Sequence, residues 1–142
     1  MHLFVYGVLI RELAKARAAE LVAPLGPGVA ARANGVLLGV PGLGGGWYPI
    51  MLFDPAGPEV HGVVHEAKSV DWAGLDAFED AHDGPGAEYR RRPIPVRLAD
   101  GSAIEAQAYC YARDVPQGAL PIAHGSFALW LAETGRLPIE AR

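Results

Sequence analysis

Runs of apolar residues alternate with clusters of glycine and proline along this chain, and their spacing predicts both strands and helices. The runs that are short and rich in Val, Leu, Ile and Tyr are typical of strands. They span residues 3–6, 29–40, 59–67, 88–98 and 104–112. Asp100-Gly101 separates the last two runs and is a common turn sequence in β-hairpins. The pattern therefore predicts that these two strands pair as a hairpin.

Apolar residues recur at helical spacing in three other segments, residues 11–22, 70–80 and 126–134. We expect Ser69 to cap the start of the second helix, and Ser126 and Gly135 to cap the two ends of the third. Ser126 is interpreted as a cap and not as a nucleophile, because the chain lacks the G-x-S-x-G elbow. Strands and helices together predict an α+β domain.

Length and charge narrow the function classes. A chain of 142 residues fits one domain, residues 1–142, that buries roughly 68% of its unfolded surface. The formal net charge of −4, from 12 Lys and Arg against 16 Asp and Glu, argues against nucleic acid as a partner. The short basic run at residues 90–92 does not change this balance.

The chain shows no segment typical of membrane insertion or export. No apolar run reaches the roughly 18 residues of a membrane span, and the apolar start lacks the basic region of a signal peptide before Arg11 interrupts it. A single cysteine, Cys110, excludes an internal disulfide and is interpreted as a packing residue. We therefore expect a cytoplasmic protein without a membrane partner.

Glu79 is the first candidate for chemistry. Trp72, Leu75 and Phe78 fall on one face of the second predicted helix, which places Glu79 at the border of the core. An ionised carboxylate there is costly unless it is paired or needed. Two interpretations stay open, a satisfied structural group and a proton carrier.

The Tyr6-Gly7 pair is the second candidate. A buried strand ends there, and the glycine allows a sharp turn toward the first predicted helix. Backbone N–H groups left unpaired at such a turn suit an anion such as a carboxylate. The sequence predicts an anion site made mainly of backbone.

Metal and nucleotide sites are not expected. His61 and His65 lie on a predicted strand, where positions four apart are separated by roughly 13 Å, too far to share one ion. Glu79 and His82 form a single Glu-x-x-His, whereas a carboxylate-bridged site needs two. The glycine-rich residues 42–46 lead into aromatics and not into a helix, so they do not form a dinucleotide fingerprint. We expect no cofactor.

Six short motifs follow one another along the chain: Leu3-Phe4-Val5-Tyr6-Gly7-Val8-Leu9, Tyr48-Pro49-Ile50, Gly62-Val63-Val64, Leu75-Asp76-Ala77-Phe78-Glu79, Tyr89-Arg90-Arg91 and Ala108-Tyr109-Cys110-Tyr111. In order and spacing they resemble the F-x-Y-G-[ST]-L, Y-P-A/I, G-x-[VL], L-D-x-[FYQ]-E, Y-x-R and A-x-x-Y motifs of the gamma-glutamylcyclotransferase-like family. This family includes the avirulence-induced-gene-like proteins of plants. The resemblance covers residues 3 to about 111.

The resemblance implies a fold and an activity. The fold is a small mixed β-barrel of about six strands with flanking helices. The activity is the cyclisation of a γ-glutamyl group to 5-oxoproline with release of the attached amine, on a small-molecule substrate and without a cofactor. Glu79 is implied as the general acid/base. The implied substrate-binding residues are Tyr6, Gly7, Val8, Leu9, Tyr48 and Tyr89.

Several positions leave alternatives open. Val8 stands where the family usually has Ser or Thr, so a hydroxyl contact to the substrate is lost while the backbone N–H remains. The alternative to an enzyme is therefore an inactive protein of the same fold that binds a carboxylate or a γ-glutamyl compound. Each of the four tyrosines Tyr6, Tyr48, Tyr89 and Tyr109 either lines the cavity or is an aromatic residue of the core or the barrel rim. Arg91 either meets a carboxylate or is an exposed strand residue.

Overall fold

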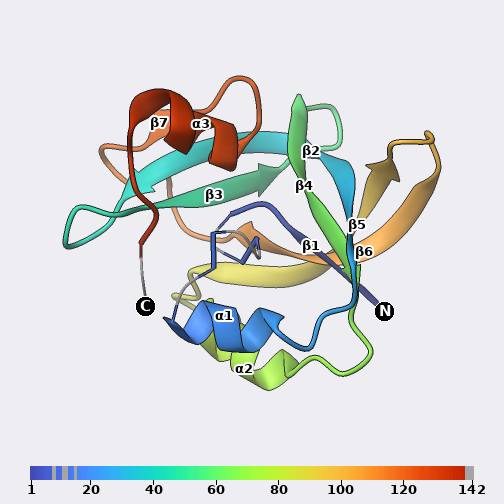
Figure 1. The fold of residues 1–142 in the computed structure, drawn as a ribbon. Helices are drawn as coiled ribbons and strands as arrows, with labels where there is room; N and C mark the ends of the chain where they lie inside the picture. The colour runs from blue at the N-terminus through green and yellow to red at the C-terminus, as the bar shows by residue number, and fades with distance from the viewer. Residues whose placement is uncertain (8, 11–12, 15, 140–142) are drawn as a thin grey trace.

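A closed β-barrel forms the centre of the molecule, with helices packed around it (Figure 1). The structure, a computed structural model, describes residues 1–7, 9–10, 13–14 and 16–139, and the elements below are those of this part of the chain. The strands are β1 (His2–Val5), β2 (Gly28–Pro41), β3 (Trp47–Phe53), β4 (Glu59–Glu66), β5 (Tyr89–Leu98), β6 (Ala103–Tyr111) and β7 (Leu120–Pro121). The helices are α1 (Ala16–Val22), α2 (Trp72–Phe78) and α3 (Phe127–Thr134).

The barrel consists of β2, β4, β1, β6 and β5 in that order, and it closes where β5 returns to β2. At the closure Ala31 lies opposite Leu98 and Arg32 opposite Arg97. Strand β1 runs parallel to β6, with Leu3 opposite Gln107, whereas the other barrel pairs are antiparallel. Strands β3 and β7 pair with the distal half of β2 and extend the sheet beyond the barrel. The mixed barrel with flanking helices confirms the predicted fold class.

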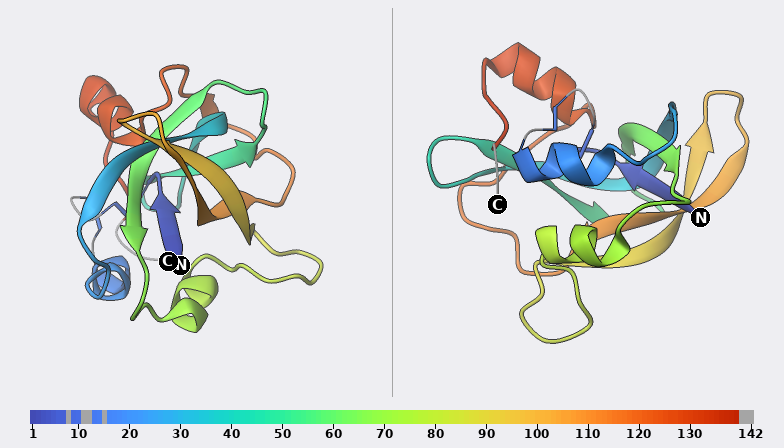
Figure 2. Two further views of the ribbon diagram at one scale, coloured as in Figure 1. Left: turned by 90° about the vertical axis from the view of Figure 1, so that its right-hand side faces the viewer. Right: turned by 60° about the horizontal axis from the view of Figure 1, so that its bottom comes forward.

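Strand β1 is buried on both of its faces and separates two hydrophobic clusters. Phe4 points to the cluster inside the barrel, whereas Leu3 and Val5 point to a second cluster outside it. That second cluster is completed by the buried residues of α1 and by Leu75 of α2. The two helices lie side by side against this part of the barrel in both views of Figure 2.

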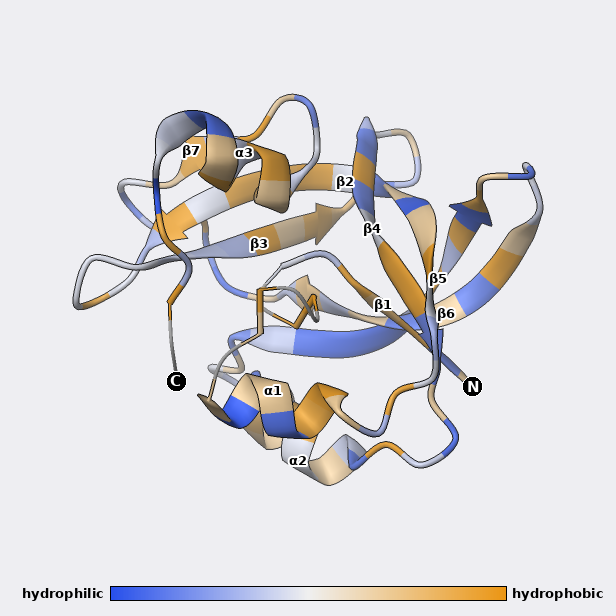
Figure 3. Cartoon of the chain, viewed as in Figure 1, coloured by the Kyte–Doolittle hydropathy of each residue, from blue (hydrophilic) through white to orange (hydrophobic). Residues whose placement is uncertain are grey.

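Burial follows the hydropathy pattern along the strands. Buried and half-buried residues alternate along the middle of β2, and Figure 3 shows hydrophobic and hydrophilic bands alternating on β2 and β4. This alternation is expected where one face of a strand packs on a core and the other meets a second layer or solvent. Within the described part of the chain, no helix is both long and apolar enough to cross a membrane.

The predicted strands and hairpin are present in the structure. Gly101 in the β5–β6 turn has a φ of 87°, a conformation that suits glycine. The predicted caps of α3 are present too. The Ser126 hydroxyl accepts a hydrogen bond from the Leu129 N–H at 3.2 Å, and Gly135 ends the helix in the left-handed conformation.

Two predictions about the other helices were wrong. The cap of α2 is Asp71 and not Ser69, because the Asp71 carboxylate accepts a hydrogen bond from the Gly74 N–H at 2.9 Å. The helix predicted over 11–22 begins at Ala16. Before it, hydrogen bonds from Ile10 N–H to the Gly7 carbonyl and from Leu13 N–H to the Ile10 carbonyl, both 2.8 Å, form turns. Residues 11, 12 and 15 of that prediction lie outside the described residues.

Candidate active site

A cavity lies between the end of β1, the start of β3 and the segment that joins α2 to β5. The described residues that line it are Phe4, Val5, Tyr6, Gly7, Leu9, Tyr48, Pro49, Glu79, Tyr89 and Tyr109. Its empty volume is about 340 Å³ including the mouth, but the space open to the centre of a water molecule is only about 20 Å³. A space of this size holds about one water, so a larger ligand extends into the mouth or displaces the walls.

The structure brings the sequence candidates together around this cavity. Of the residues proposed for substrate binding, Tyr6, Gly7, Leu9, Tyr48 and Tyr89 all line it, and Glu79 lines it from the opposite segment. Val8 lies outside the described residues. Segments more than 70 positions apart in sequence thus meet at one cavity, while the functional role of each residue stays a prediction.

Glu79 reaches the cavity because α2 ends immediately before it. The Glu79 N–H donates to the Leu75 carbonyl at 3.0 Å, so this residue completes the last turn of the helix. The residue as a whole is only 5% exposed, which is rare for glutamate. Its negative charge contributes to raising the pKa of both Tyr89 and Tyr109, after the larger effect of burial. Glu79 therefore lies within electrostatic reach of both phenols.

Gly7 allows the end of β1 to pass directly over β3. A Cβ atom at this position would lie 2.0 Å from Cγ and 2.7 Å from Cδ of Pro49. No side chain fits at such distances, because both atoms belong to a rigid proline ring that also lines the cavity. Glycine is required here by close packing, and the turn that starts at this residue forms one wall of the site.

Each of three tyrosines on the cavity wall gives its hydroxyl proton to an acceptor in the protein. Tyr6 donates to the backbone carbonyl of Tyr109, and Tyr89 donates to the Pro49 carbonyl at 2.9 Å. Tyr109 donates to Oδ1 of Asp76 at 2.8 Å. Burial is the main cause that raises the pKa of Tyr89 and of Tyr109 well above the ordinary value for tyrosine, so both phenols stay protonated at neutral pH.

Asp76 is the residue that sequence reasoning missed. Its carboxylate accepts from Arg91 twice, Nε to Oδ1 at 2.8 Å and Nη2 to Oδ2 at 3.2 Å, besides the bond from Tyr109. The guanidinium also stacks 4.6 Å above the Trp72 ring. Arg91 therefore meets a carboxylate, the first of the two alternatives left open for it, and that carboxylate belongs to the protein. Both residues were present in the motifs Leu75-Asp76 and Tyr89-Arg90-Arg91, but spacing alone does not pair them.

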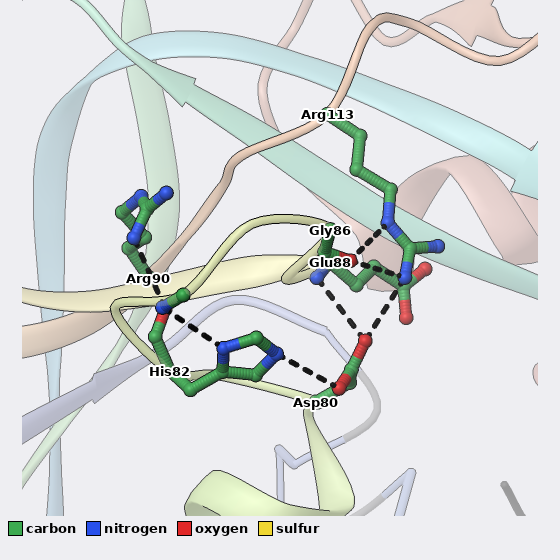
Figure 4. Close-up of polar contacts among 7 residues, drawn as sticks. Asp80, His82, Gly86, Glu88, Arg90 and Arg113 are labelled. Atoms are coloured by element: carbon green, nitrogen blue, oxygen red, sulfur yellow. Dashed lines mark hydrogen bonds and ion pairs between the residues drawn. The ribbon is translucent and has the colours of Figure 1, made fainter.

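The loop between Glu79 and Tyr89 is held by a cluster of polar contacts (Figure 4). Asp80 has a φ of 50°, and its Oδ2 accepts from Nη2 of Arg113 at 2.9 Å and from the Glu88 N–H at 3.3 Å. Arg113 also donates to the Gly86 carbonyl, from Nε at 3.0 Å and from Nη2 at 2.8 Å. The cluster ties both ends of the loop together, and each end carries one cavity residue.

The remaining candidates lie apart from the cavity. His61 and His65 are both on β4, and the His65 ring nitrogen Nδ1 lies 2.8 Å from the Gly26 carbonyl oxygen. Among the described residues no three His, Cys, Asp or Glu side chains come close enough together to hold a metal ion. Cys110 is buried in the barrel, and burial raises the pKa of its thiol to about 11. This thiol is therefore a poor nucleophile at neutral pH.

Sequence comparison connects this geometry with known proteins. The family model for gamma-glutamyl cyclotransferase, AIG2-like proteins matches residues 3–129. None of the curated proteins matches the chain.

Solved structures show the same fold. An AIG2-like protein from Mus musculus is 25% identical with a TM-score of 0.63, and the alignment covers 99% of this chain and 97% of that one. A gamma-glutamyl cyclotransferase structure is 17% identical with a TM-score of 0.65, and the alignment covers 99% and 89%.

YkqA from Bacillus subtilis is similar to the chain over only part of its own length. It is 20% identical with a TM-score of 0.63, and the alignment covers 94% of this chain but 42% of YkqA. The chain thus spans less than half of that relative, whereas it spans nearly all of the mouse protein. With a family model that matches most of its residues and a barrel that is shared with these structures, the chain belongs to the gamma-glutamyl cyclotransferase, AIG2-like family.

Proposed function

We propose that this protein is a γ-glutamyl cyclotransferase that converts a γ-glutamyl amine or γ-glutamyl amino acid into 5-oxoproline and the free amine. The observation that carries the proposal is the position of Glu79, which is buried and lines the same cavity as the Tyr6-Gly7 turn. A buried carboxylate in a cavity lined by aromatic side chains is a typical acid/base site. Membership of the family supports the same reaction class.

The reaction needs one proton carrier. The α-amine of the γ-glutamyl group, in its neutral form, attacks the carbonyl carbon of its own γ-amide and forms the new N–C bond of a five-membered ring. One proton leaves that nitrogen for Glu79, and Glu79 returns it to the leaving nitrogen as the old C–N bond breaks. The products together contain all the atoms of the substrate. General acid/base help of this kind contributes about 10²–10⁴-fold.

The cavity wall also has to hold the γ-glutamyl group in the bent conformation that ring closure requires. Ring closure requires the amine to approach its own carbonyl, and oriented intramolecular reactions reach effective molarities of roughly 10⁵ M or more. In this proposal, backbone N–H groups of the turn that begins at Gly7 bind the carboxylate or the carbonyl of the substrate, and the rings of Tyr48 and Tyr89 restrict the space beside it. Such restriction favours the bent form.

The test is release of 5-oxoproline from a panel of γ-glutamyl amino acids and γ-glutamyl amines by purified protein. Glu79→Gln is compared with Glu88→Gln, which changes a carboxylate of similar burial that does not line the cavity. We expect release by the wild type and by Glu88→Gln, and a loss of about 100-fold or more in Glu79→Gln. Equal turnover by Glu79→Gln and the wild type would remove Glu79 from the mechanism.

A second candidate function rests on Val8, where the family usually has a hydroxyl side chain. A protein that binds a γ-glutamyl compound or a simple carboxylate without consuming it would show saturable binding and no 5-oxoproline in the same panel. Binding is followed by shifts of backbone amide signals in nuclear magnetic resonance spectra. Val8→Thr then separates the two candidates further, because a restored hydroxyl raises turnover only if the site is catalytic.

A further inference from the structure

Three tyrosines that line the cavity share one property. The phenols of Tyr6, Tyr89 and Tyr109 each give their only proton to a carbonyl or carboxylate of the protein. A hydroxyl whose proton is committed can only accept further hydrogen bonds. Glu79, when ionised, is also an acceptor only. Tyr109, whose proton goes to Asp76, can therefore only accept a hydrogen bond from a ligand in the cavity.

Tyr109 is the phenol whose orientation is best fixed. Its proton goes to Asp76, and Asp76 is held in turn by the two hydrogen bonds from Arg91. The side chain is buried, with the whole residue 3% exposed. Turning the hydroxyl toward the cavity would leave the partly buried Asp76 carboxylate without one of its donors, which is costly. The phenol oxygen therefore presents lone pairs and not its proton.

We propose that Tyr109 accepts a hydrogen bond from the nitrogen that closes the ring, which is the α-amine of the substrate and the lactam N–H of 5-oxoproline. Asp76 is the positioning residue that keeps the phenol in this acceptor orientation. The proposal rests on the proposed cyclotransferase function and adds to it a specificity-determining residue. A ligand that carries an oxygen atom in place of this nitrogen has no proton to donate there. Its lone pairs face those of the Tyr109 phenol oxygen, and the two oxygen atoms repel each other.

The arrangement also orients the attacking nitrogen. A neutral amine has two N–H groups and one lone pair. One N–H donates to Tyr109 and the other faces Glu79, so the lone pair is left for the carbonyl carbon. Both acceptors line the same cavity, and the charge of Glu79 acts on the Tyr109 phenol. Directing the lone pair in this way is part of the near-attack geometry that ring closure needs.

The experiment compares two unreactive ligands of nearly equal shape. One is 5-oxoproline, and the other is 5-oxotetrahydrofuran-2-carboxylate, in which the ring N–H is replaced by oxygen. Dissociation constants are obtained from nuclear magnetic resonance titrations. We expect the wild type to bind the lactam about tenfold or more tightly than the lactone, because sites built around hydrogen bonds reject analogues that lack them.

Variants assign this preference to Tyr109. In Tyr109→Phe the preference falls to about twofold or less, while lactone affinity stays within about twofold of the wild type and reports that the site is intact. Tyr111→Phe removes a hydroxyl two residues along the same strand, outside the cavity, and keeps the preference. Asp76→Asn also lowers the preference, because its amide N–H₂ can donate to the phenol oxygen and release the phenol proton to the cavity.

Two results would overturn the proposal. One is a wild type that binds lactam and lactone equally or does not bind the lactam. The other is a Tyr109→Phe variant that keeps the wild-type preference. The 5-oxoproline release assay then shows whether only the role of Tyr109 or also the cyclotransferase function is wrong. If the wild type still turns over a γ-glutamyl compound, only the role of Tyr109 is lost. If no γ-glutamyl compound is turned over, the cyclotransferase proposal fails as well.

Discussion

Arg91 binds Asp76 through two parallel hydrogen bonds, at 2.8 Å and 3.2 Å, and so joins β5 to α2. Leu75 of α2 packs into the apolar cluster outside the barrel, and apolar packing of this kind constrains distance more than rotation. A planar guanidinium on a carboxylate fixes both. Asp76 lies in α2 and Glu79 directly follows that helix, so the ion pair anchors the helix from which Glu79 reaches the cavity.

Loss of this pair is expected to cost stability. Both side chains are less than one third exposed, so Arg91→Ala leaves a partly buried carboxylate with fewer donors. We expect the free energy of unfolding to fall by about 1–3 kcal/mol. Arg91→Lys recovers only part of it because an ammonium cannot form both bonds. Urea unfolding measures the free energy of unfolding of both variants.

The control is Arg97→Ala, which breaks a more exposed ion pair with Glu59 and should lower the free energy of unfolding by less than about 1 kcal/mol. An equal loss in both alanine variants would contradict this prediction.

Gly7→Ala is expected to damage the site more than the fold. The added methyl group would overlap the Pro49 ring, so the turn and the start of β3 must move apart. Overpacking of this kind costs about 1–3 kcal/mol, and a displacement of about 1 Å at a reacting site costs on the order of 100-fold in turnover. Thermal unfolding and 5-oxoproline release are measured together. Gly26→Ala is the matched control, since the nearest atoms to its added Cβ lie 3.7 Å away. Full activity in Gly7→Ala would show that the turn does not hold substrate.

The sequence predicts the residues of the cavity better than it predicts how they are connected. Tyr6, Gly7 and Glu79 stand out because a glycine turn and a carboxylate beside apolar positions conflict with plain core packing. Periodicity predicts which face of a strand is buried but not which strand lies next to it. The parallel pairing of β1 with β6 and the closure of β5 on β2 therefore appear only in the structure.

The same limit explains the missed contacts and the wrong cap. Tyr109 meets Asp76 across 33 positions of sequence, and no local pattern links them. Ser69 and Asp71 are both good capping residues, and sequence does not choose between neighbours of similar propensity. Burial of Leu75 fixes the position of the helix. In that position the Asp71 carboxylate reaches the Gly74 N–H, so Asp71 is the cap.

Arg113→Ala is expected to loosen the loop between Glu79 and Tyr89 with little effect on global stability. The Arg113–Asp80 pair is about half exposed, so its loss should change the free energy of unfolding by less than about 1 kcal/mol. The loop loses the donors to Asp80 and Gly86, and amide exchange of Glu88 should become faster. Hydrogen exchange detected by mass spectrometry measures this. We expect kcat to fall severalfold with the same Tm.

The control for the loop is Arg17→Ala, which breaks an exposed pair within α1. It should leave loop exchange and kcat unchanged. If both variants exchange at the wild-type rate over residues 80–88, the polar cluster does not hold the loop and its connection with Glu79 is refuted.

The buried thiol of Cys110 is expected to make the free energy of unfolding fall as the pH rises above 9. Burial raises the pKa of its thiol from 9.0 to about 11 in the folded protein, so the folded state holds this proton more tightly than the unfolded state does. The protonated thiol contributes fully to the free energy of unfolding below pH 9, and this contribution is lost as the pH rises toward 11. At 1.36 kcal/mol for each pH unit between the two pKa values, the loss totals about 2–3 kcal/mol. Urea unfolding of wild type and Cys110→Ala at several pH values isolates it, because the other groups that titrate there are common to both. The stability difference between the two proteins should be constant from pH 7 to 8 and fall between pH 9 and 11. A difference that does not change with pH would place the thiol in contact with water.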